Sequence, residues 1–213
     1  MGYAIQQISY DLTRSWNAGP VNRLTDPGFA YSSTSTLAGW WRLNEDVSST
    51  GDATDSSGNA RNGTFLSAEF RPISNGLSPS DRYIQGSSCL FDGTWSRVNV
   101  GSAETWNSII GTDGTKQMSF SIWLQKTGDG TSSFPRLFDF GGEDIAVYLD
   151  NDGVIYFVAL TEGGGGGKVY WKTSDRWITT TDWFHVTVTF DGTDTNNNPI
   201  FYVNGAEAPS QYD

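Results

Sequence analysis

Apolar and polar residues alternate along much of the chain from residue 37 onward. In MSFSIWLQK, residues 118–126, every second residue from Met118 to Leu124 is apolar, and FHVTVTFDG, residues 184–192, alternates in the same way. A period of two is typical of half-buried strands in an antiparallel sheet. No segment offers ten or more residues at helical spacing with helix caps. The pattern therefore predicts an all-β protein.

Turn signals separate these predicted strands at short intervals. Two apolar runs flank Asp-Asn-Asp-Gly at residues 150–153, which predicts a hairpin. In IFYVNGAEA, residues 200–208, an Asn-Gly pair lies where a type I′ turn is expected. The stretch 103–110 is a candidate for a short helix or turn, and the five glycines at 163–167 predict a loop tip. Many short strands with closely spaced turns favour an antiparallel β-sandwich or jelly roll.

Residues 1–36 differ from the rest because their aromatic residues and prolines follow no sustained period. We predict an N-terminal arm over residues 1–36, ordered by contact with a partner, and one β-sandwich domain over residues 37–213. One or two strands lying on the domain surface are an equally good interpretation of the same segment. No basic segment followed by an apolar core stands at the start, so we expect no secretory signal.

The charge balance narrows the classes of partner. The chain carries 24 acidic and 13 basic residues, a formal net charge of -11. Such a surface repels nucleic acid phosphates and anionic lipid headgroups, so we expect neither nucleic acid binding nor membrane insertion. The single cysteine, Cys89, excludes an intrachain disulfide and is expected to be buried as a small hydrophobic residue.

Five segments occur in an order that is more informative than any one of them alone. They are LAGWWRLNEDVSSTGDATDSSGNARNGTF, GSSCLFDGTWSRVNVG, MSFSIWLQ, DWFHVTVTFDG and IFYVNGAEA. Together they resemble the concanavalin A-like, laminin-G-like domain family over residues 37–208. The resemblance implies two curved antiparallel sheets packed face to face, a fold shared by lectins, glycan-binding modules, adhesion domains and some glycosidases. Because one fold hosts many activities, the fold alone assigns no function.

The end of the chain departs from the family pattern. The family usually continues beyond the Asn-Gly hairpin with one or two closing strands, whereas this chain stops at APSQYD. A sandwich without its closing strands would have unpaired edges and an opened core. Three explanations are open: the chain is part of a longer one, a neighbouring subunit supplies the strand, or the N-terminal arm supplies it.

Candidate catalytic residues are few. His185 is the only histidine, so any histidine-based triad would have to use it. The resemblance implies a structural role at that position. Glycosidases need two carboxylates at a fixed separation, and the alternating acidic strand of glucanases with this fold has no counterpart here. The carboxylates of GGEDIAVYLDND are interpreted as turn residues, namely Glu143, Asp144, Asp150 and Asp152. We therefore predict no enzyme activity and assign no catalytic residue.

The polar stretch DATDSSGNARNGTF, residues 52–65, is the candidate metal site. The resemblance implies that a structural Ca²⁺ can bind through loop oxygens, of which calcium takes six to eight. The candidate ligands are Glu45, Asp52, Asp55 and Asn59. The interpretation that we favour is structural: Asp55, Ser56 and Asn59 bond to nearby backbone in Asx-type turns, and Gly58 adopts a positive φ. We assign no metal ligand and no cofactor, with structural Ca²⁺ as the alternative.

Aromatic residues are the candidate sugar platforms. The chain has nine tryptophans, and sugar sites combine an exposed ring with surrounding polar groups. The rings that we consider are Trp95, Trp106, Trp171 and Trp177. With so many aromatic residues, most rings are expected to lie in the core.

Two hypotheses on function follow. The first is a non-enzymatic structural or adhesion protein of a virion, such as a phage head decoration, tail or fibre component. A fold that is usually extracellular here lacks an export signal and follows an arm typical of assembly proteins. Its partners would be other subunits, contacted through residues 1–36 and the C-terminal edge. The second is a glycan-binding module of a secreted or cell-surface protein. We favour the first, located in the virion.

Overall fold

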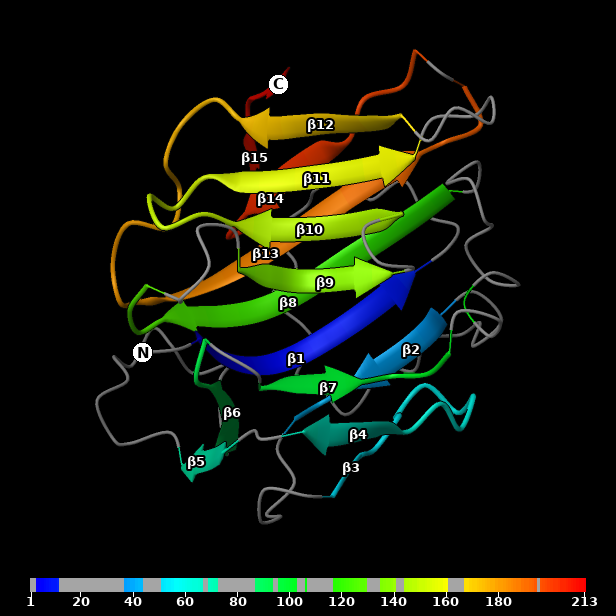
Figure 1. The fold of residues 1–213 in the computed structure, drawn as a ribbon, viewed down its shortest axis with the longest axis vertical. Coiled ribbons are helices and arrows are strands. Elements are labelled where there is room, and N and C mark those ends of the chain that lie inside the picture. The colour runs from blue at the N-terminus through cyan, green and yellow to red at the C-terminus, as the bar shows by residue number, and fades with distance from the viewer. Residues whose placement is uncertain are drawn as a thin grey trace.

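In the computed structural model, the elements are strands arranged in three sheets (Figure 1). The residues that the structure describes are 3–11, 37–43, 51–66, 69–72, 87–93, 96–102, 106, 117–129, 135–140, 144–160, 167–194 and 196–213. Within these ranges no helix has the length and apolar character that a membrane span requires. Of the stretch 103–110 only Trp106 is described, and its N–H donates to the Ser102 carbonyl at 3.2 Å. The all-β prediction is confirmed.

The large sheet has eight strands. Seven follow the order β15-β14-β13-β8-β1-β6-β5, and β2 pairs with the same edge of β1 as β6. Every pairing in this sheet is antiparallel. In chain order the strands are β1 Tyr3–Asp11, β2 Leu37–Trp41, β5 Glu69–Pro72, β6 Ser87–Phe91, β8 Gln117–Lys126, β13 Trp183–Asp191, β14 Ile200–Val203 and β15 Ala206–Ala208.

Two further sheets complete the molecule. The five-stranded sheet has the order β16-β12-β11-β10-β9 and lies in front of the large sheet in Figure 1. Its strands are β9 Arg136–Phe140, β10 Ile145–Leu149, β11 Ile155–Leu160, β12 Lys168–Thr173 and β16 Ser210–Tyr212. The three-stranded sheet consists of β3 Asp52–Ala53, β4 Gly63–Leu66 and β7 Arg97–Asn99, with β4 in the middle.

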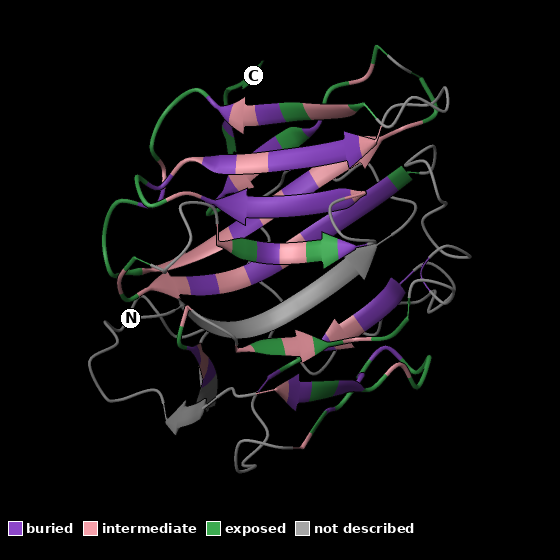
Figure 2. Cartoon of the chain, viewed as in Figure 1, coloured by how far each residue is buried: buried purple, intermediate pink, exposed green. Residues whose placement is uncertain are grey.

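The hydrophobic core lies between the large sheet and the five-stranded sheet. Strands β10 and β11 are almost wholly buried (Figure 2). The apolar side chains of β8 point into this core, where Ile122 is 1% exposed and Leu124 is 0% exposed. Phe190 of β13 packs against Phe157 of β11, with ring centroids 5.0 Å apart. The alternation seen in the sequence therefore divides β8 and β13 into a core face and an outer face.

The N-terminal segment contributes a strand to the middle of the large sheet. Strand β1 pairs along its length with β8 on one edge, and with β6 and then β2 on the other. Residues 12–36 lie outside the described part of the chain, so the division at residue 37 and the role of the segment as a partner-ordered arm stay predictions. Residues 37–208 alone do not complete the large sheet, because β1 lies between β8 on one edge and both β2 and β6 on the other.

The C-terminal residues join the two large layers. Strand β15 belongs to the large sheet and β16 to the five-stranded sheet, and only Pro209 separates them. The Pro209 carbonyl accepts a hydrogen bond from the Ser174 N–H at 2.7 Å, which holds this corner against the loop after β12. Three explanations for the missing closing strand were open. In the structure the N-terminal segment supplies a strand, β1, which pairs with β8.

Both predicted hairpins are present. Strands β10 and β11 pair around the turn 150–153, and β14 and β15 pair around Asn204 and Gly205. Asn204 and Gly205 have φ values of 51° and 79°, as a type I′ turn requires. Of the glycines at 163–167 only Gly167 is described, so the predicted loop tip lies outside the described residues.

Candidate functional site

Asp55 organises the polar stretch 52–65. Its Oδ1 accepts hydrogen bonds from the N–H groups of Trp40 and Ser57, both at 2.9 Å. Its Oδ2 accepts from the Ser57 hydroxyl at 2.8 Å and from the Arg61 N–H at 3.0 Å. Burial by itself would raise the pKa of Asp55, but these hydrogen bonds outweigh it and hold that pKa below its ordinary value. Both carboxylate oxygens are therefore engaged by the protein itself.

Other side chains of the same stretch anchor it to β2. The Asn59 amide donates to the Leu37 carbonyl and the Arg61 guanidinium to the Ala38 carbonyl, each at 2.6 Å. The indole N–H of Trp41, which is fully buried, donates to the Arg61 carbonyl at 2.8 Å. The stretch thus works as a structural crossing that fixes the edge of β2.

The predicted turn chemistry is confirmed for Asp55 and Gly58, and corrected for the serine. The Ser57 N–H bond to Asp55 is an Asx-type bond, and Gly58 has φ +88°. Ser57, rather than the predicted Ser56, makes the next local bond, because its hydroxyl accepts the Asn59 N–H at 3.3 Å. The sequence could not separate two adjacent serines, since only one of them faces the Asp55 carboxylate in the folded turn.

The described candidate ligands offer few free oxygen atoms to a calcium ion. Among the candidate ligands Asp55 is saturated, Asn59 uses its amide on β2, and Asp52 is exposed. Glu45 lies outside the described residues. In the described ranges no group of three or more His, Cys, Asp or Glu side chains is placed to hold a metal ion. A calcium ion at this stretch stays a prediction.

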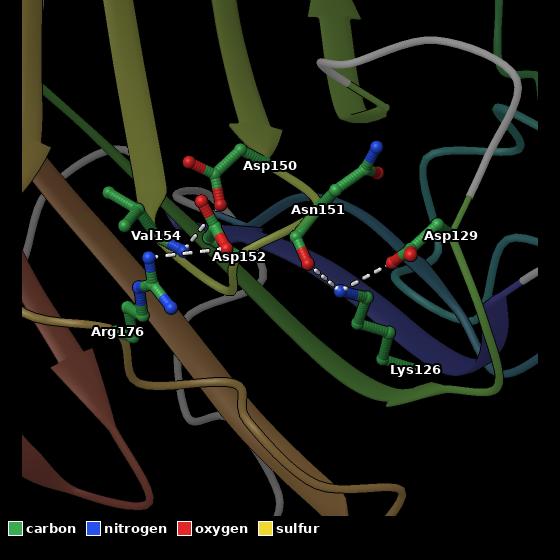
Figure 3. Close-up of polar contacts among 7 residues, drawn as sticks. All are labelled: Lys126, Asp129, Asp150, Asn151, Asp152, Val154 and Arg176. Atoms are coloured by element: carbon green, nitrogen blue, oxygen red, sulfur yellow. Dashed lines mark hydrogen bonds and ion pairs between the residues drawn. The ribbon is translucent and has the colours of Figure 1, made fainter.

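The turn 150–153 uses its carboxylates structurally, as predicted (Figure 3). Asp150 Oδ1 accepts a hydrogen bond from the Val154 N–H at 2.8 Å. Asp152 pairs with Arg176 at 3.3 Å, and because both side chains are more than 60% exposed the pair contributes only about 0–1 kcal/mol. Glu143 lies outside the described residues.

Lys126, at the end of β8, links this turn to the large sheet. Its ammonium donates to the Asn151 carbonyl of the turn and pairs with Asp129 at 2.9 Å (Figure 3). The Lys126 side chain is 13% exposed and the Asp129 side chain 61%. The contact ties the two sheets at one end of the sandwich, and the polar groups around it are already paired.

Two of the candidate sugar platforms lie in the core, where most rings were expected. Trp106 and Trp171 are 3% and 7% exposed, and their indole N–H groups donate within the protein at 3.1 and 2.9 Å. Trp177 is half-buried and packs against the core. Trp95 lies outside the described residues. Composition cannot tell a core ring from a surface ring, because both are apolar and both occur in strands.

The outer face of the five-stranded sheet carries aromatic rings whose charged neighbours are already paired. One row in register crosses all five strands and consists of Arg136, Tyr148, Tyr156, Lys172 and Gln211. Arg136 lies 6.0 Å from the Tyr148 ring centroid and pairs with Asp139 at 2.9 Å. Lys172 lies 5.9 Å from the Tyr156 ring centroid and is bonded to Asp213. A ligand on this face would have to break these contacts, so the row is best explained as a structural layer.

The outer face of the large sheet carries an aromatic and hydroxyl cluster. Trp123 of β8 and His185 of β13 are register partners, and their ring centroids lie 4.9 Å apart. His185 Nε2 is 2.7 Å from the Ser121 hydroxyl, which is in turn 3.3 Å from the Thr187 hydroxyl. All four side chains are half-buried. They belong to the phase of β8 and β13 opposite to the core residues.

His185 is a neutral packing residue in this cluster at pH 7. Burial lowers its pKa from 6.5 to about 4, and no neighbouring charge contributes to the shift. A histidine that activates serine is oriented by a carboxylate and works beside oxyanion donors. In the described part of the chain, the imidazole contacts the Ser121 hydroxyl and the Trp123 ring. His185 therefore contributes packing and a hydrogen bond to the cluster without adding charge.

A register row extends this cluster across six strands of the large sheet. From β2 to β15 its members are Trp40, Ser9, Ser121, Thr187, Tyr202 and Glu207. At one end the Arg42 guanidinium lies 4.6 Å from the Trp40 ring centroid. At the other end, burial raises the pKa of Tyr202, and the negative charge of Glu207 raises it further. We call this row, with Trp123, Trp183 and His185 beside it, the large-sheet face.

Several polar groups of the large-sheet face are available to a ligand. Within the described ranges the structure records no hydrogen bond for the indole N–H groups of Trp123 and Trp183 or for the Tyr202 hydroxyl. Among the side chains that the structure describes, the buried polar atoms without a partner are the indole nitrogen of Trp40, at the β2 end of the row, and that of Trp177. Half-buried rings with available donors are what a sugar platform needs.

Sequence reasoning missed these rings, although a signal was present. Trp123 lies in the polar phase of MSFSIWLQK, next to Ser121, and Trp183 and His185 share the corresponding phase of β13. An aromatic residue in the polar phase of an alternating strand points away from the core. Phase within the strand is therefore a better guide to a platform residue than proximity to a glycine-rich loop.

Comparison with known proteins agrees with this architecture. A family model described as the concanavalin A-like lectin/glucanases superfamily matches residues 99–212, just over half of the chain. No curated protein and no solved structure matches it. The matched range contains β8 to β16, which form the five-stranded sheet and half of the large sheet. The chain belongs to the concanavalin A-like lectin/glucanase superfamily.

Proposed function

We propose that the protein is a non-enzymatic adhesion module that binds a neutral glycan on its large-sheet face. The observation that carries the proposal is the register row of the large-sheet face, in which Ser121, Thr187 and Tyr202 follow one another across β8, β13 and β14 beside the Trp123 ring. Strands in a sheet are spaced ~4.8 Å apart, so Ser121, Thr187, Tyr202 and Glu207 place a polar side chain on each of four successive strands. Family membership supports a lectin or adhesion-type module.

The chemistry of the face suits a sugar. A pyranose ring offers apolar C–H groups to an aromatic side chain and hydroxyl groups to donors and acceptors around it. Trp123 supplies the ring, which lies 4.9 Å from the His185 ring at an interplanar angle of 37°. The hydroxyls of Ser121, Thr187 and Tyr202 line the row beside it. A neutral histidine adds a polar group there without adding charge.

Charge favours a neutral glycan over an acidic one. The row ends in Glu207, and the chain as a whole carries a formal net charge of -11. Sulfated or carboxylated sugars would be repelled by this field. Arg42, the cation nearest the other end, is already placed over the Trp40 ring.

A glycan array followed by calorimetry tests the proposal. We expect saturable binding of a neutral glycan, and at least tenfold weaker binding for Trp123→Ala, which corresponds to about 1.4 kcal/mol. Tyr202→Phe, which keeps the ring and removes the hydroxyl, should weaken binding without loss of folding. Tyr170→Ala is the matched control, because Tyr170 is 37% exposed on the five-stranded sheet. Absence of binding to every neutral glycan, or equal losses for Tyr170→Ala and Trp123→Ala, would refute the proposal.

We extend the proposal to location: the module is an exposed component of a virion, such as a head decoration, tail or fibre protein. The acidic composition, rich in glycine and poor in helix formers, supports an exposed assembly domain. Particles purified on a density gradient and probed with an antibody against the recombinant chain should carry the protein in fixed ratio to the major capsid protein. Labelling of cell surfaces, with none on particles, would instead favour a secreted or cell-surface glycan-binding module.

A further inference from the structure

Strand β1 is held in the large sheet by partners that are far away in the chain. Its residues Tyr3–Asp11 pair with β8, and Ile5 is also in register with Cys89 of β6. The nearest partner in sequence, β2, begins at Leu37. Because backbone hydrogen bonds on both edges hold β1, its position can be filled by any chain with the same strand.

The rest of the sheet depends on that position being filled. Without β1, the edge of β8 and the edges of β2 and β6 would be unpaired, and the strands β2, β5 and β6 would be separated from β8. Unpaired edges are templates for strands from another molecule. A copy that has lost its own β1 would therefore present a complementary site for the β1 of a second copy.

The connection after β1 is long enough for exchange. Adjacent antiparallel strands can be joined by two to five residues, whereas β1 and β2 are joined by residues 12–36. At ~3.3 Å per residue such a connection spans up to roughly 80 Å when extended. A domain of this length has a radius of gyration of roughly 17 Å, so the extended connection is longer than the domain is wide. The connection therefore places no geometric limit on reaching a neighbouring copy.

We propose that β1 is an exchangeable strand: in an assembly, the β1 of one copy occupies the position between β8 and the β2 and β6 pair of a second copy of this chain. The exchanged and unexchanged forms contain the same strand pairings, so concentration decides between them. For a connection of 25 residues, the effective concentration of β1 for its own sheet is about 1 mM or less. Exchange is expected to dominate above that concentration, as within an ordered particle.

Exchange also reaches the large-sheet face. Ser9, a member of its register row, lies on β1, so an exchanged assembly completes each row with a residue from another copy. The inference itself rests on strand pairing and does not depend on glycan binding.

Disulfide trapping tests the inference, because Ile5 and the single cysteine are register partners. Opposed residues in an antiparallel pair have Cα atoms about 4.5–5.5 Å apart, within the range for a disulfide. One chain carries Ile5→Cys with Cys89→Ala, and the other is the unmodified chain. The two are co-refolded at about 10 µM and at about 1 mM, oxidised with glutathione disulfide and separated without reductant. Exchange places the cysteine introduced at position 5 of one chain opposite Cys89 of the other, so a covalent heterodimer above the level of the oxidation control reports exchange.

We expect a heterodimer at the higher concentration and at least tenfold less at the lower one. Ile5→Cys alone should give an intrachain disulfide at the lower concentration. Ile8→Cys, whose partners are Trp41 and Ile122, is the control for random oxidation. An intrachain disulfide without any heterodimer overturns the proposal, and so does failure of both disulfides. Light scattering of the unmodified chain, refolded at the same concentrations, needs no variant: monomers alone at both would equally overturn it.

Discussion

His185 makes the stability of this protein depend on pH between 6.5 and about 4. It is the only histidine, and burial lowers its pKa from 6.5 in the unfolded chain to about 4 in the folded one. The unfolded state therefore takes up a proton first as pH falls. The stability contributed by the neutral imidazole is complete above pH 6.5, is lost progressively as pH falls from 6.5 toward 4, and changes no further below that.

The size of the loss follows from the shift. Lowering the pKa of His185 from 6.5 to about 4 corresponds to at most about 3 kcal/mol, and between pH 7 and pH 5 the expected loss of stability is about 2 kcal/mol. For a chain of this length, that loss lowers the melting temperature by roughly 4–8 °C. The carboxyls with lowered pKa, Asp55 and Asp191, start from 3.8 and contribute below this window. Of the described groups whose pKa is shifted, His185 is therefore the one that titrates between pH 6.5 and 5.

Urea unfolding at pH 7 and pH 5 measures the effect. In His185→Gln, whose side-chain amide can still reach the Ser121 hydroxyl, the pH-dependent loss should fall to a few tenths of a kcal/mol. Because there is one histidine, a proton–carbon NMR titration follows its ring directly. An imidazole that titrates near pH 6.5, or a variant that keeps the whole pH slope, would refute the argument from burial.

Two further predictions concern the polar stretch and the hairpin turn. Asp55→Asn should reduce the free energy of unfolding by about 2–3 kcal/mol, because a carboxylate oxygen that accepts two hydrogen bonds is replaced by an amide group that donates. Asp52 is exposed, so Asp52→Asn should change the free energy of unfolding by less than ~0.5 kcal/mol in the same urea titration. Equal losses in the two variants would contradict the role of Asp55. Gly153→Ala should cost more than ~2 kcal/mol, because at φ +92° the added Cβ would lie 2.2 Å from the Ile178 carbonyl oxygen. Gly58→Ala has a similar φ of +88° with no neighbour within 4 Å and should cost only about 1 kcal/mol; a loss for Gly58→Ala as large as that for Gly153→Ala would mean that backbone strain, not the contact with Ile178, sets the cost.

Local pattern was sufficient for much of the fold. The alternation in β8 and β13 specified strands and their two faces, because the pleat turns successive side chains to opposite sides whatever lies next to them. The hairpin turns at 150–153 and at Asn204 were readable for the same reason, since turn geometry depends on a few adjacent residues. The signature around Asp55 was interpreted correctly as structural, although Ser57 and not Ser56 completes it.

The position of β1 and the composition of the large-sheet face were decided by tertiary structure. Nothing within Tyr3–Asp11 states that its neighbours are β8 and β6, because any strand with free backbone groups can pair with any other, and the choice depends on which edges the rest of the fold leaves open. Likewise Trp106 and Trp123 have the same side chain, and only packing places one in the core and the other on an outer face. Sequence determined the period of each strand, a local property; which strands meet, and hence which side chains gather into a site, is non-local and follows from the closure of the whole sheet.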